Sequence, residues 1–408
     1  MRQDIHANQR DTTLPTARSG DSGLLRKLNL AAAMKAFLDA ELLTVSDIRS
    51  TVGVSRPTAE ELLATLLEQG FIREAPAPAN GGRTPGRPAR HYEVAAENFT
   101  VVGIDIGAHK VAVVLCDLRG NVLSVRRRSV DPDVGPAGRI GIAARLMKAA
   151  VRQTGTSWDH IRGVACGLTG AVTAGAVVRD IRTLRAGRDL DVYSLPGFDE
   201  IDVVAKISSC FERDVLVAND IHLAAVAERW QGAAVGARDL VYMHAGRRLW
   251  SAIVIDGRIH TGRHGLAAHV GAMKLLGWPE AMEALDREAH RLADSTTERS
   301  TGNQVRAVFA AAANGDRSAA RAVDRVAEAL ALGASTLVHA IDPDLVVLGG
   351  GLSRTGDVLA EPFERHLAAT SFATPEFRVS LLGDESVALG AARLALDDFE
   401  ARLLAIPA

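Results

Sequence analysis

The sequence predicts an α/β protein with a small helix–turn–helix module and a wing ahead of a larger body. Between residues 23 and 75, apolar residues follow helical spacing that a tight turn interrupts. A Pro- and Gly-rich segment at 76–91 then lies between two short β-rich stretches, as the loop of a hairpin would. From residue 100 onward, β-rich runs and helical runs alternate, which is the pattern of an α/β body.

Length and charge bound the classes of protein that fit. The chain has 408 residues, enough for two to three domains at about 150 residues per domain. Lys plus Arg number 47 and Asp plus Glu number 49, for a formal net charge of −2. This balance excludes a globally basic nucleic-acid coat, but it allows a small DNA-reading module on a neutral body.

The cysteines and the apolar runs indicate a cytoplasmic protein. Cys116, Cys166 and Cys210 are far apart and form no CxxC pair, which excludes a disulfide scaffold and a cysteine-rich zinc site. No apolar run approaches the roughly 18 residues of a membrane span. Residues 1–20 lack an apolar signal-peptide core and are expected to form a flexible tail.

Two short helices separated by a turn form the predicted DNA-reading element. Ser46 is expected to cap the first helix, and Gly53 ends it. Ser55 is expected to cap the second helix, whose first residues would face the major groove. Arginine is the commonest reader of guanine. The candidate DNA contacts here are Ser55, Arg56 and Thr58.

The 76–91 segment is the predicted wing, with arginines suited to phosphates or a narrow minor groove. Residues 21–95 hold nine basic and nine acidic residues, and Glu60 and Glu61 place negative charge near the expected DNA backbone. The wing arginines therefore carry more of the expected binding. For Arg56 of the second helix, the alternative interpretation is a solvated arginine on a protein-interaction helix. The wing arginines are Arg83, Arg87 and Arg90.

Several motifs occur together and in order. They are SRPT (55–58), GRPAR (86–90), GIDIG (103–107), VAND (217–220), DGRIHTGRHGLAAHVG (256–271), DPDLVVLGGGLS (342–353) and LGAARLA (389–395). With them the chain resembles the ROK family (repressors, open reading frames and sugar kinases), specifically its DNA-binding regulators, from about residue 25 to 397. The resemblance implies a two-lobed body with an actin-like, ribonuclease-H-like fold around a cleft.

The resemblance also implies a domain organisation. A flexible tail at 1–20 precedes a winged helix-turn-helix domain at 21–96 and a sugar-kinase-like body at 97–408. The first lobe of the body is expected at about 97–218 with 387–404, and the second at about 219–386.

The two loops that would hold a nucleotide depart from the family pattern. Ala108 and His109 stand where the family has Gly and Thr, so a Cβ and an imidazole would crowd a phosphate. Arg247, Arg248 and Trp250 replace small residues of the second loop. The retained positions, interpreted as vestigial nucleotide-binding residues, are Asp105, Gly107, Gly349 and Gly350.

The sugar-binding signature is altered as well. In the family, the aspartate matching Asp220 is the general base and the asparagine matching Asn219 binds the sugar; an Asx cap by Asp220 is the alternative interpretation. His269 stands where the family has a sugar-binding glutamate, and Ala272 where it has a zinc-ligating histidine. We expect neither a metal nor a cofactor, and we assign effector binding to Asn219, Asp220 and His269.

Together, these expectations predict a DNA-binding regulator that has no catalytic residues. The chain would bind double-stranded operator DNA as a homodimer or homotetramer, and a sugar or sugar-phosphate effector in the cleft would shift its DNA-binding heads. The resemblance implies repression, but the residues leave activation open. Two alternatives are an active ATP-dependent sugar kinase with an accessory DNA-binding domain and a ligand-blind oligomerisation body.

Overall fold

The computed structural model describes residues 22–76, 89–170, 172–173, 176–177, 195–198, 200–293 and 301–404. The chain divides into two units, Met1–Val94 with Glu400–Ala408, and Ala95–Phe399. Within the described residues, none of the helices has a stretch both long and apolar enough to cross a bilayer.

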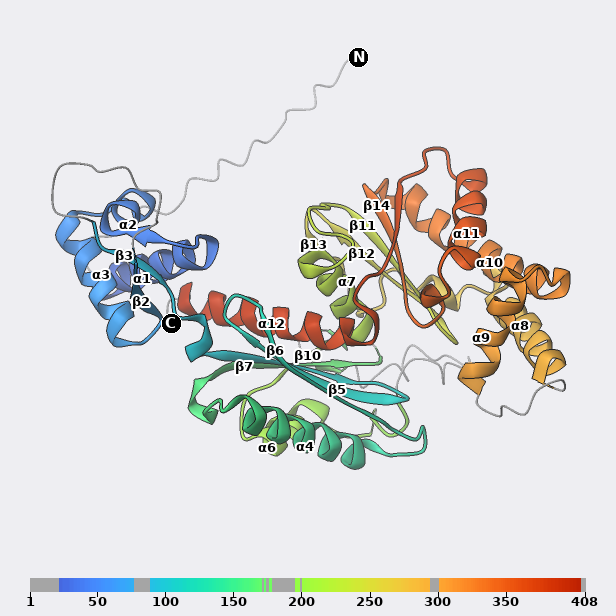
Figure 1. Cartoon of the computed structure of the whole chain (residues 1–408), viewed down its shortest axis with the longest axis horizontal. Coiled ribbons are helices and arrows are strands. Elements are labelled where there is room, and N and C mark those ends of the chain that lie inside the picture. Colours follow the sequence, from blue (N-terminus) through green and yellow to red (C-terminus); the bar gives the residue numbers. More distant parts are fainter. Residues whose placement is uncertain are drawn as a thin grey trace, which may run out of the picture. The chain divides into compact units, whose positions relative to one another are not determined.

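The first unit holds the predicted helix–turn–helix and a small antiparallel sheet with strand order β1-β3-β2 (Figure 1). Strands β2 and β3 pair from Ile72↔Val94 to Ala75↔His91, so they form the two sides of the predicted hairpin. The segment between them, residues 77–88, lies outside the described residues. The elements are α1 (Ser22–Asp39), β1 (Leu43–Thr44), α2 (Val45–Val52), α3 (Arg56–Glu68), β2 (Ile72–Ala75) and β3 (His91–Val94).

The cap of α2 differs from the prediction. Thr44, not Ser46, caps the helix, because the Thr44 N–H donates to Asp47 Oδ2 (2.8 Å) and the Asp47 N–H donates to Thr44 Oγ1 (3.3 Å). This reciprocal capping box needs an acid or amide three residues after the cap, and only Thr44 has one. Gly53 ends α2 with φ +74°, and Ser55 caps α3, as predicted.

The apolar faces of the three helices form the core of this unit. Along α3, buried residues recur at the helical spacing that the sequence shows. They pack with buried residues of α1 and α2. The largest of these buried side chains are Met34, Phe37, Ile48, Leu62, Leu63 and Leu66.

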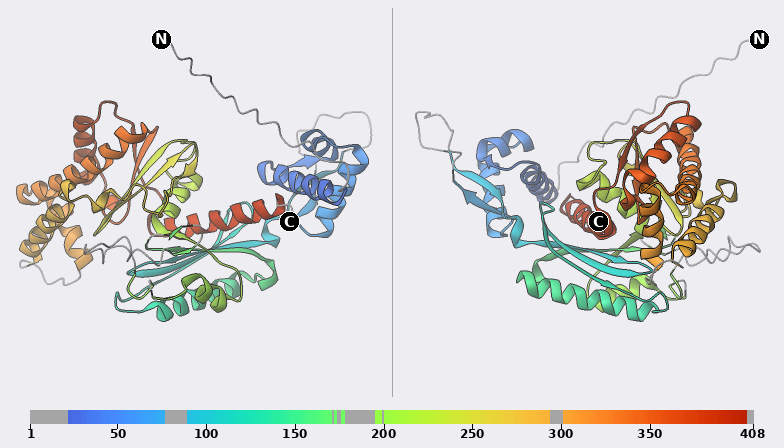
Figure 2. Two further views of the ribbon diagram at one scale, coloured as in Figure 1. Left: turned by 180° about the vertical axis from the view of Figure 1, so that it is seen from behind. Right: turned by 45° about the vertical axis from the view of Figure 1, so that its right-hand side comes forward.

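The second unit contains two five-stranded sheets, the first with order β10-β7-β4-β5-β6. Strands β4, β5 and β6 are antiparallel, whereas β7 and β10 extend the sheet in parallel. Helices α4 and α6 cover one face and α12 the other, as Figure 2 shows from two further sides. The elements are β4 (Thr100–Ile106), β5 (Lys110–Asp117), β6 (Val122–Ser129), α4 (Pro136–Thr154), β7 (Ile161–Leu168), α6 (Val203–Phe211), β10 (Leu216–Asn219) and α12 (Ser386–Leu404).

The second sheet has the order β13-β12-β11-β14-β15 and packs against the long helices of the second half of the chain. Alanine-rich α10 contributes many of the buried residues of this core. The elements are β11 (Leu240–Ala245), β12 (Leu249–Ile255), β13 (Arg258–Ile259), α8 (Trp278–Ala293), α9 (Thr301–Ala313), α10 (Arg317–Ile341), β14 (Leu345–Gly349), α11 (Asp357–Thr370) and β15 (Glu376–Val379).

Two helices lie where the chain passes from one sheet to the other. Helix α7 (Asp220–Gln231) follows β10, and α12 returns to the first sheet after β15. A Cβ built on Gly390 of α12 would lie 1.9 Å from the Leu223 carbonyl oxygen of α7, so the two helices touch backbone to backbone. The remaining short elements are β8 (Val172–Thr173), β9 (Ala176–Val177), η1 (Ala96–Asn98), η2 (Trp158–His160), η3 (Val270–Ala272), η4 (Lys274–Leu276), η5 (Leu352–Thr355) and η6 (Gly383–Glu385).

Candidate functional sites

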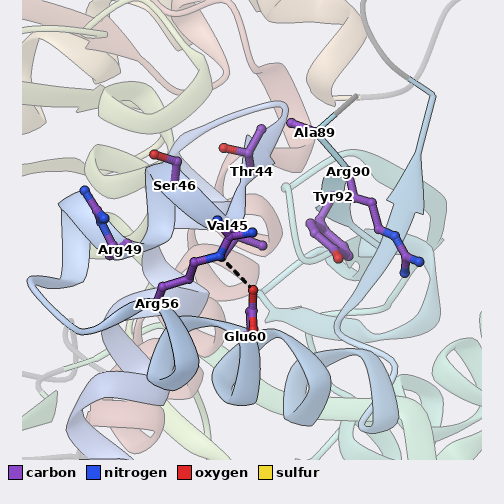
Figure 3. A pocket seen from close by; sticks show the side chains of 9 residues that line it. All are labelled: Thr44, Val45, Ser46, Arg49, Arg56, Glu60, Ala89, Arg90 and Tyr92. Atoms are coloured by element: carbon purple, nitrogen blue, oxygen red, sulfur yellow. Dashed lines mark hydrogen bonds and ion pairs between the residues drawn. The ribbon is translucent and has the colours of Figure 1, made fainter. Parts of the chain in front are cut away.

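A groove of ≈ 590 Å³ lies between α2, α3 and the start of β3 in the first unit (Figure 3). Its walls carry three arginines and one glutamate, with two hydroxyl side chains from the start of α2. We call it the reading groove. It is lined by Thr44, Val45, Ser46, Arg49, Arg56, Glu60, Ala89, Arg90 and Tyr92.

The first turn of α3 places the predicted DNA contacts in two different settings. Arg56 is exposed, and its Nε donates to Glu60 Oε1 at 3.0 Å across one helical turn. The Thr58 N–H donates to Ser55 Oγ at 3.4 Å, and the two hydroxyls share a hydrogen bond of 2.8 Å. Ser55 and Thr58 therefore stabilise the start of the helix, whereas Arg56 faces the groove.

Only one of the three predicted wing arginines falls within the described residues. Arg90 Nη1 donates to Glu74 Oε1 at 2.8 Å, across the base of the β2–β3 hairpin. Arg83 and Arg87 lie outside the described residues. An acid of the same module thus pairs with the one wing arginine that the structure describes.

Sequence reasoning missed Arg49 of α2. It is exposed, lines the reading groove and forms no ion pair with any of the described residues. Arg26, Arg56, Arg73 and Arg90, in contrast, each pair with a glutamate. The sequence did offer one signal for Arg49: it is a basic residue one turn before Gly53, on the first of the two helices of the motif.

In the second unit, Asn219 and Asp220 stand where β10 passes into α7. The buried Asn219 caps the helix: its Oδ1 accepts from the N–H groups of Ile221 (2.9 Å) and His222 (3.0 Å), and its Nδ2 donates to the Gly170 carbonyl (2.8 Å). The alternative interpretation gave the cap to Asp220. The structure gives it to Asn219, which releases one carboxylate oxygen of Asp220 for another partner.

That partner is Thr169, whose hydroxyl donates to Asp220 Oδ2 at 2.6 Å. Burial raises the pKa of Asp220 to about 6, although the Thr169 hydrogen bond lowers it, and the nearby Asp105 carboxylate adds to the rise. A carboxylate with such a pKa can accept a proton or a hydrogen bond from a ligand hydroxyl near neutral pH.

His269 packs against a residue of the altered second loop. Its ring meets Trp250 edge to face, with centroids 5.1 Å apart, and its Nδ1 lies 3.0 Å from the Ala267 carbonyl oxygen. Burial lowers the pKa of His269. The bulky Trp250 thus packs against the His269 imidazole.

His222 is a second buried imidazole that sequence reasoning missed. Burial, together with a smaller contribution from the neighbouring His269, lowers its pKa to about 4. Its Nε2 has no hydrogen-bond partner among the described residues. The only sequence signal for it was its place two residues after Asp220.

The loop that follows β4 is held by cations of the chain itself. Lys110 Nζ lies 3.1 Å from Asp105 Oδ2 and also donates to the Asp384 carbonyl. The buried Arg139 donates from Nη1 to the Gly107 carbonyl at 2.5 Å. Burial raises the pKa of Asp105 against the opposing effect of Lys110. Asp105 and Gly107 thus have structural partners in this fold.

The retained glycines after β14 also have a packing reason. A Cβ on Gly349 would lie 2.2 Å from the Tyr242 hydroxyl, and one on Gly350, at φ +90°, would lie 2.4 Å from the Ala245 carbonyl oxygen. Strand β11 therefore requires both glycines. Arg247 of the second loop pairs with Asp286 at 2.6 Å.

An ion-pair cluster surrounds the short helix η6, just before α12. Arg354 makes two hydrogen bonds to the Asp384 carboxylate (3.0 and 2.7 Å), and Arg127 lies 3.5 Å from it and 3.3 Å from Glu385 Oε1. Burial alone would raise the pKa of Asp384, but Arg354, Lys110 and Arg127 lower it. These ion pairs link strand β6 and helix η5 to helix η6.

Within the described residues, no group of three or more His, Cys, Asp or Glu side chains is arranged to hold a metal ion. Cys116 and Cys166 are buried, and all three cysteines are free thiols.

Comparison with known proteins gives two family matches on this one chain. The ROK family model matches residues 101–398, and the IclR helix-turn-helix domain model matches residues 30–76. The xylose repressor of Caldicellulosiruptor bescii is 22% identical over 408 residues, covering 93% of this chain and 98% of that protein. The glucokinase of Thermotoga maritima is 24% identical and covers 72% of this chain and 96% of its own length.

Among solved structures, a ROK family transcriptional regulator described as a homolog of the E. coli MLC protein has the same fold. It shares 17% sequence identity at a TM-score of 0.71, over 93% of this chain and 98% of that one. The fold predicted from the sequence, a helix–turn–helix module joined to a ROK body, is confirmed by this likeness and by the two family matches.

Proposed function

The chain belongs to the ROK family, and we propose that it is a DNA-binding transcriptional repressor whose two-lobed body senses a ligand. The observation that carries this proposal is the presence of both parts in one chain, a helix–turn–helix domain at 30–76 ahead of a ROK body at 101–398. A relative that aligns over nearly the whole chain is named a xylose repressor, which supports repression as the outcome of binding.

The DNA-binding domain is assigned to residues 21–96 and the body to 97–408, with residues 1–20 as a tail. The first lobe then comprises 97–218 with 387–404, and the second lobe 219–386. The boundary at 96/97 falls close to the division of the chain between Val94 and Ala95, whereas Glu400–Ala408 are grouped with the first unit.

The reading groove is the proposed operator interface. Arg56 lies at the N-terminal turn of the second helix of the motif, where base edges are read. Arg49 and Arg90 line the same groove and would contact phosphates, joined by Arg83 and Arg87 of the wing. Ser55 and Thr58 hold the turn in shape and can add phosphate contacts.

The body is proposed to bind a sugar or sugar phosphate without transferring a phosphoryl group. Asn219, Asp220 and His269 are the proposed effector contacts. Asp105, Gly107, Gly349 and Gly350 are interpreted as vestiges of a nucleotide site, because the chain's own groups engage or pack against each of them. No catalytic residue and no cofactor is assigned.

An ATP-dependent sugar kinase is the second candidate, and one observation favours it. The raised pKa of Asp220, about 6, suits a general base for a sugar hydroxyl. A coupled assay for ADP release, run with a panel of hexoses and pentoses, tests this candidate. Turnover that disappears in Asp220→Asn would establish the kinase and reject a body that only senses.

Two copies of the domain are needed for a palindromic operator, so we propose a homodimer or homotetramer. Half-sites about one helical turn, roughly 34–36 Å, apart would then be contacted together. An effector that changes the spacing or freedom of the two domains would release one half-site.

Selection of bound sequences from a random duplex pool tests the proposed function. The wild type and an Arg56→Ala, Arg87→Ala double variant are compared, with Arg73→Ala as the matched control. Arg73 is also an exposed, glutamate-paired arginine of this unit, but it does not line the reading groove. We expect wild type and control to enrich the same palindrome and the double variant to lose it.

Low salt strengthens phosphate contacts and gives the test its fairest conditions. A wild-type protein that enriches no sequence at low ionic strength would reject the proposed function. A motif lost equally in the Arg73→Ala control would place the contacts outside the reading groove.

A further inference from the structure

The base-facing turn of α3 carries a cation and an acid as a pair. Arg56 Nε and Glu60 Oε1 are 3.0 Å apart, both side chains are exposed, and both line the reading groove (Figure 3). A surface built only to neutralise phosphates gains nothing from an acid at this place, because the carboxylate cancels the charge of Arg56. The acid therefore needs a partner on the DNA other than phosphate.

Helix geometry lets the pair contact neighbouring bases. Residues four apart lie on one face of a helix and are separated by about 6 Å along its axis. Successive base pairs are about 3.4 Å apart. Two side chains so placed reach the same base pair or pairs at most two steps apart.

The chemistry of the two side chains selects different bases. A guanidinium donates to O6 and N7 of guanine, whereas a carboxylate accepts from the N4 amino group of cytosine. We propose that Arg56 and Glu60 together read a guanine and a cytosine within two base pairs, with Glu60 as the residue that sets the cytosine preference. This inference rests on the proposed DNA-binding function. Without DNA the two side chains satisfy each other, and on the operator each exchanges its partner for a base.

Glu61, the next residue of α3, provides a matched control. Its side chain is 60% exposed against 53% for Glu60, and it pairs with Arg26 of α1 at 3.1 Å. Glu61 does not line the reading groove. Glu60→Gln and Glu61→Gln each remove one negative charge from the same helix, so only the position relative to the groove differs.

The test is selection from a random duplex pool with full-length wild type, Glu60→Gln, Glu61→Gln and Arg56→Ala, followed by titration of the wild-type site and its single-base variants. We expect the cytosine position to shift toward adenine in Glu60→Gln, because an amide pairs with adenine. Discrimination at that position should fall by about 10-fold or more, the size of one good base contact. Arg56→Ala should relax the guanine position instead.

Glu61→Gln should keep both base preferences and raise affinity for all sequences by a similar factor. Glu60→Asp, which keeps the charge but shortens the side chain, should weaken the cytosine preference without raising non-specific affinity; it keeps the inference testable if Glu60→Gln does not fold. An unchanged cytosine position in either Glu60 variant overturns the inference while leaving the proposed function intact. A wild type that enriches no motif overturns both.

Discussion

At the scale of single residues, the body of the protein shifts the pKa values of Asp220 and Asp384 in opposite directions. Burial raises the pKa of Asp220 to about 6. Around Asp384, the guanidinium of Arg354 and the charges of Lys110 and Arg127 outweigh burial and lower the pKa. The free energy of unfolding should therefore respond to pH with opposite signs at the two positions.

Asp220→Asn is expected to stabilise the protein, and more so at pH 8 than at pH 5. The folded-state pKa of Asp220 is above its ordinary value of 3.8, so its ionisation opposes folding increasingly as pH rises from about 4 to 6. Removing the charge should recover up to about 3 kcal/mol above pH 6, at about 1.4 kcal/mol per pKa unit. Thermal unfolding of wild type and variant across this pH range measures the difference.

Asp384→Asn is the opposite-sign companion. Because the folded-state pKa of Asp384 is lowered, its carboxylate stabilises the fold above its ordinary pKa, and this contribution disappears as pH falls through the folded-state pKa. The variant should lose about 1–2 kcal/mol at pH 7, since Arg354 then faces a neutral amide. A variant whose melting temperature differs from wild type equally at pH 7 and pH 3 would contradict this account.

At the scale of elements, α2 is capped by Thr44, whereas the sequence predicted Ser46 as the cap. Thr44→Ala removes one side of the capping box with Asp47 and should destabilise the first unit by about 1 kcal/mol. Ser46→Ala is the control and should change the free energy of unfolding by a few tenths of a kcal/mol at most. Chemical denaturation of both variants compares them directly, and an equal loss in the two would reject Thr44 as the cap.

Other elements show where sequence information suffices. Apolar spacing predicts α3, and the alternation of strands and helices after residue 100 predicts an α/β body, because each buried face leaves a periodic pattern of apolar residues. The i, i+4 spacing of Arg56 and Glu60 would even have predicted their ion pair. Predicting the ion pair of Arg90 with Glu74 would have required the register of the β2–β3 hairpin, and a local sequence pattern does not determine that register.

The candidate sites were predicted less completely than the fold. The motif at the end of a strand predicted that Asp220 and Asn219 belong to a candidate site. Which of the two caps the helix and which remains for a ligand depends on the direction of the backbone. His222 and Arg49 were missed, because a buried histidine and a solvated arginine have no sequence periodicity of their own. Packing across elements, as between Trp250 and His269, is visible only in the folded chain.

At the scale of the whole molecule, α12 connects the Asp384 ion-pair cluster with α7 inside the second unit. It begins directly after the Asp384 ion-pair cluster, packs against α7 and ends at Leu404.

Coupling between an effector site in the body and the DNA-binding module would be reciprocal. A sugar or sugar phosphate that binds the body should raise its melting temperature, with a stabilisation of about 2.7 kcal/mol at 100 times the dissociation constant. The same ligand should weaken operator binding by some factor, and operator DNA must then weaken ligand binding by that same factor. Titration calorimetry of the ligand with and without operator duplex, together with operator titrations with and without ligand, gives both factors.

Asp220→Asn should reduce ligand affinity while leaving operator affinity without ligand unchanged. A ligand that stabilises the body but leaves operator affinity unchanged would show that ligand binding and DNA release are uncoupled. If no sugar, sugar phosphate or nucleotide in a panel shifts the melting temperature, the result favours a body that only holds the DNA-binding domains together.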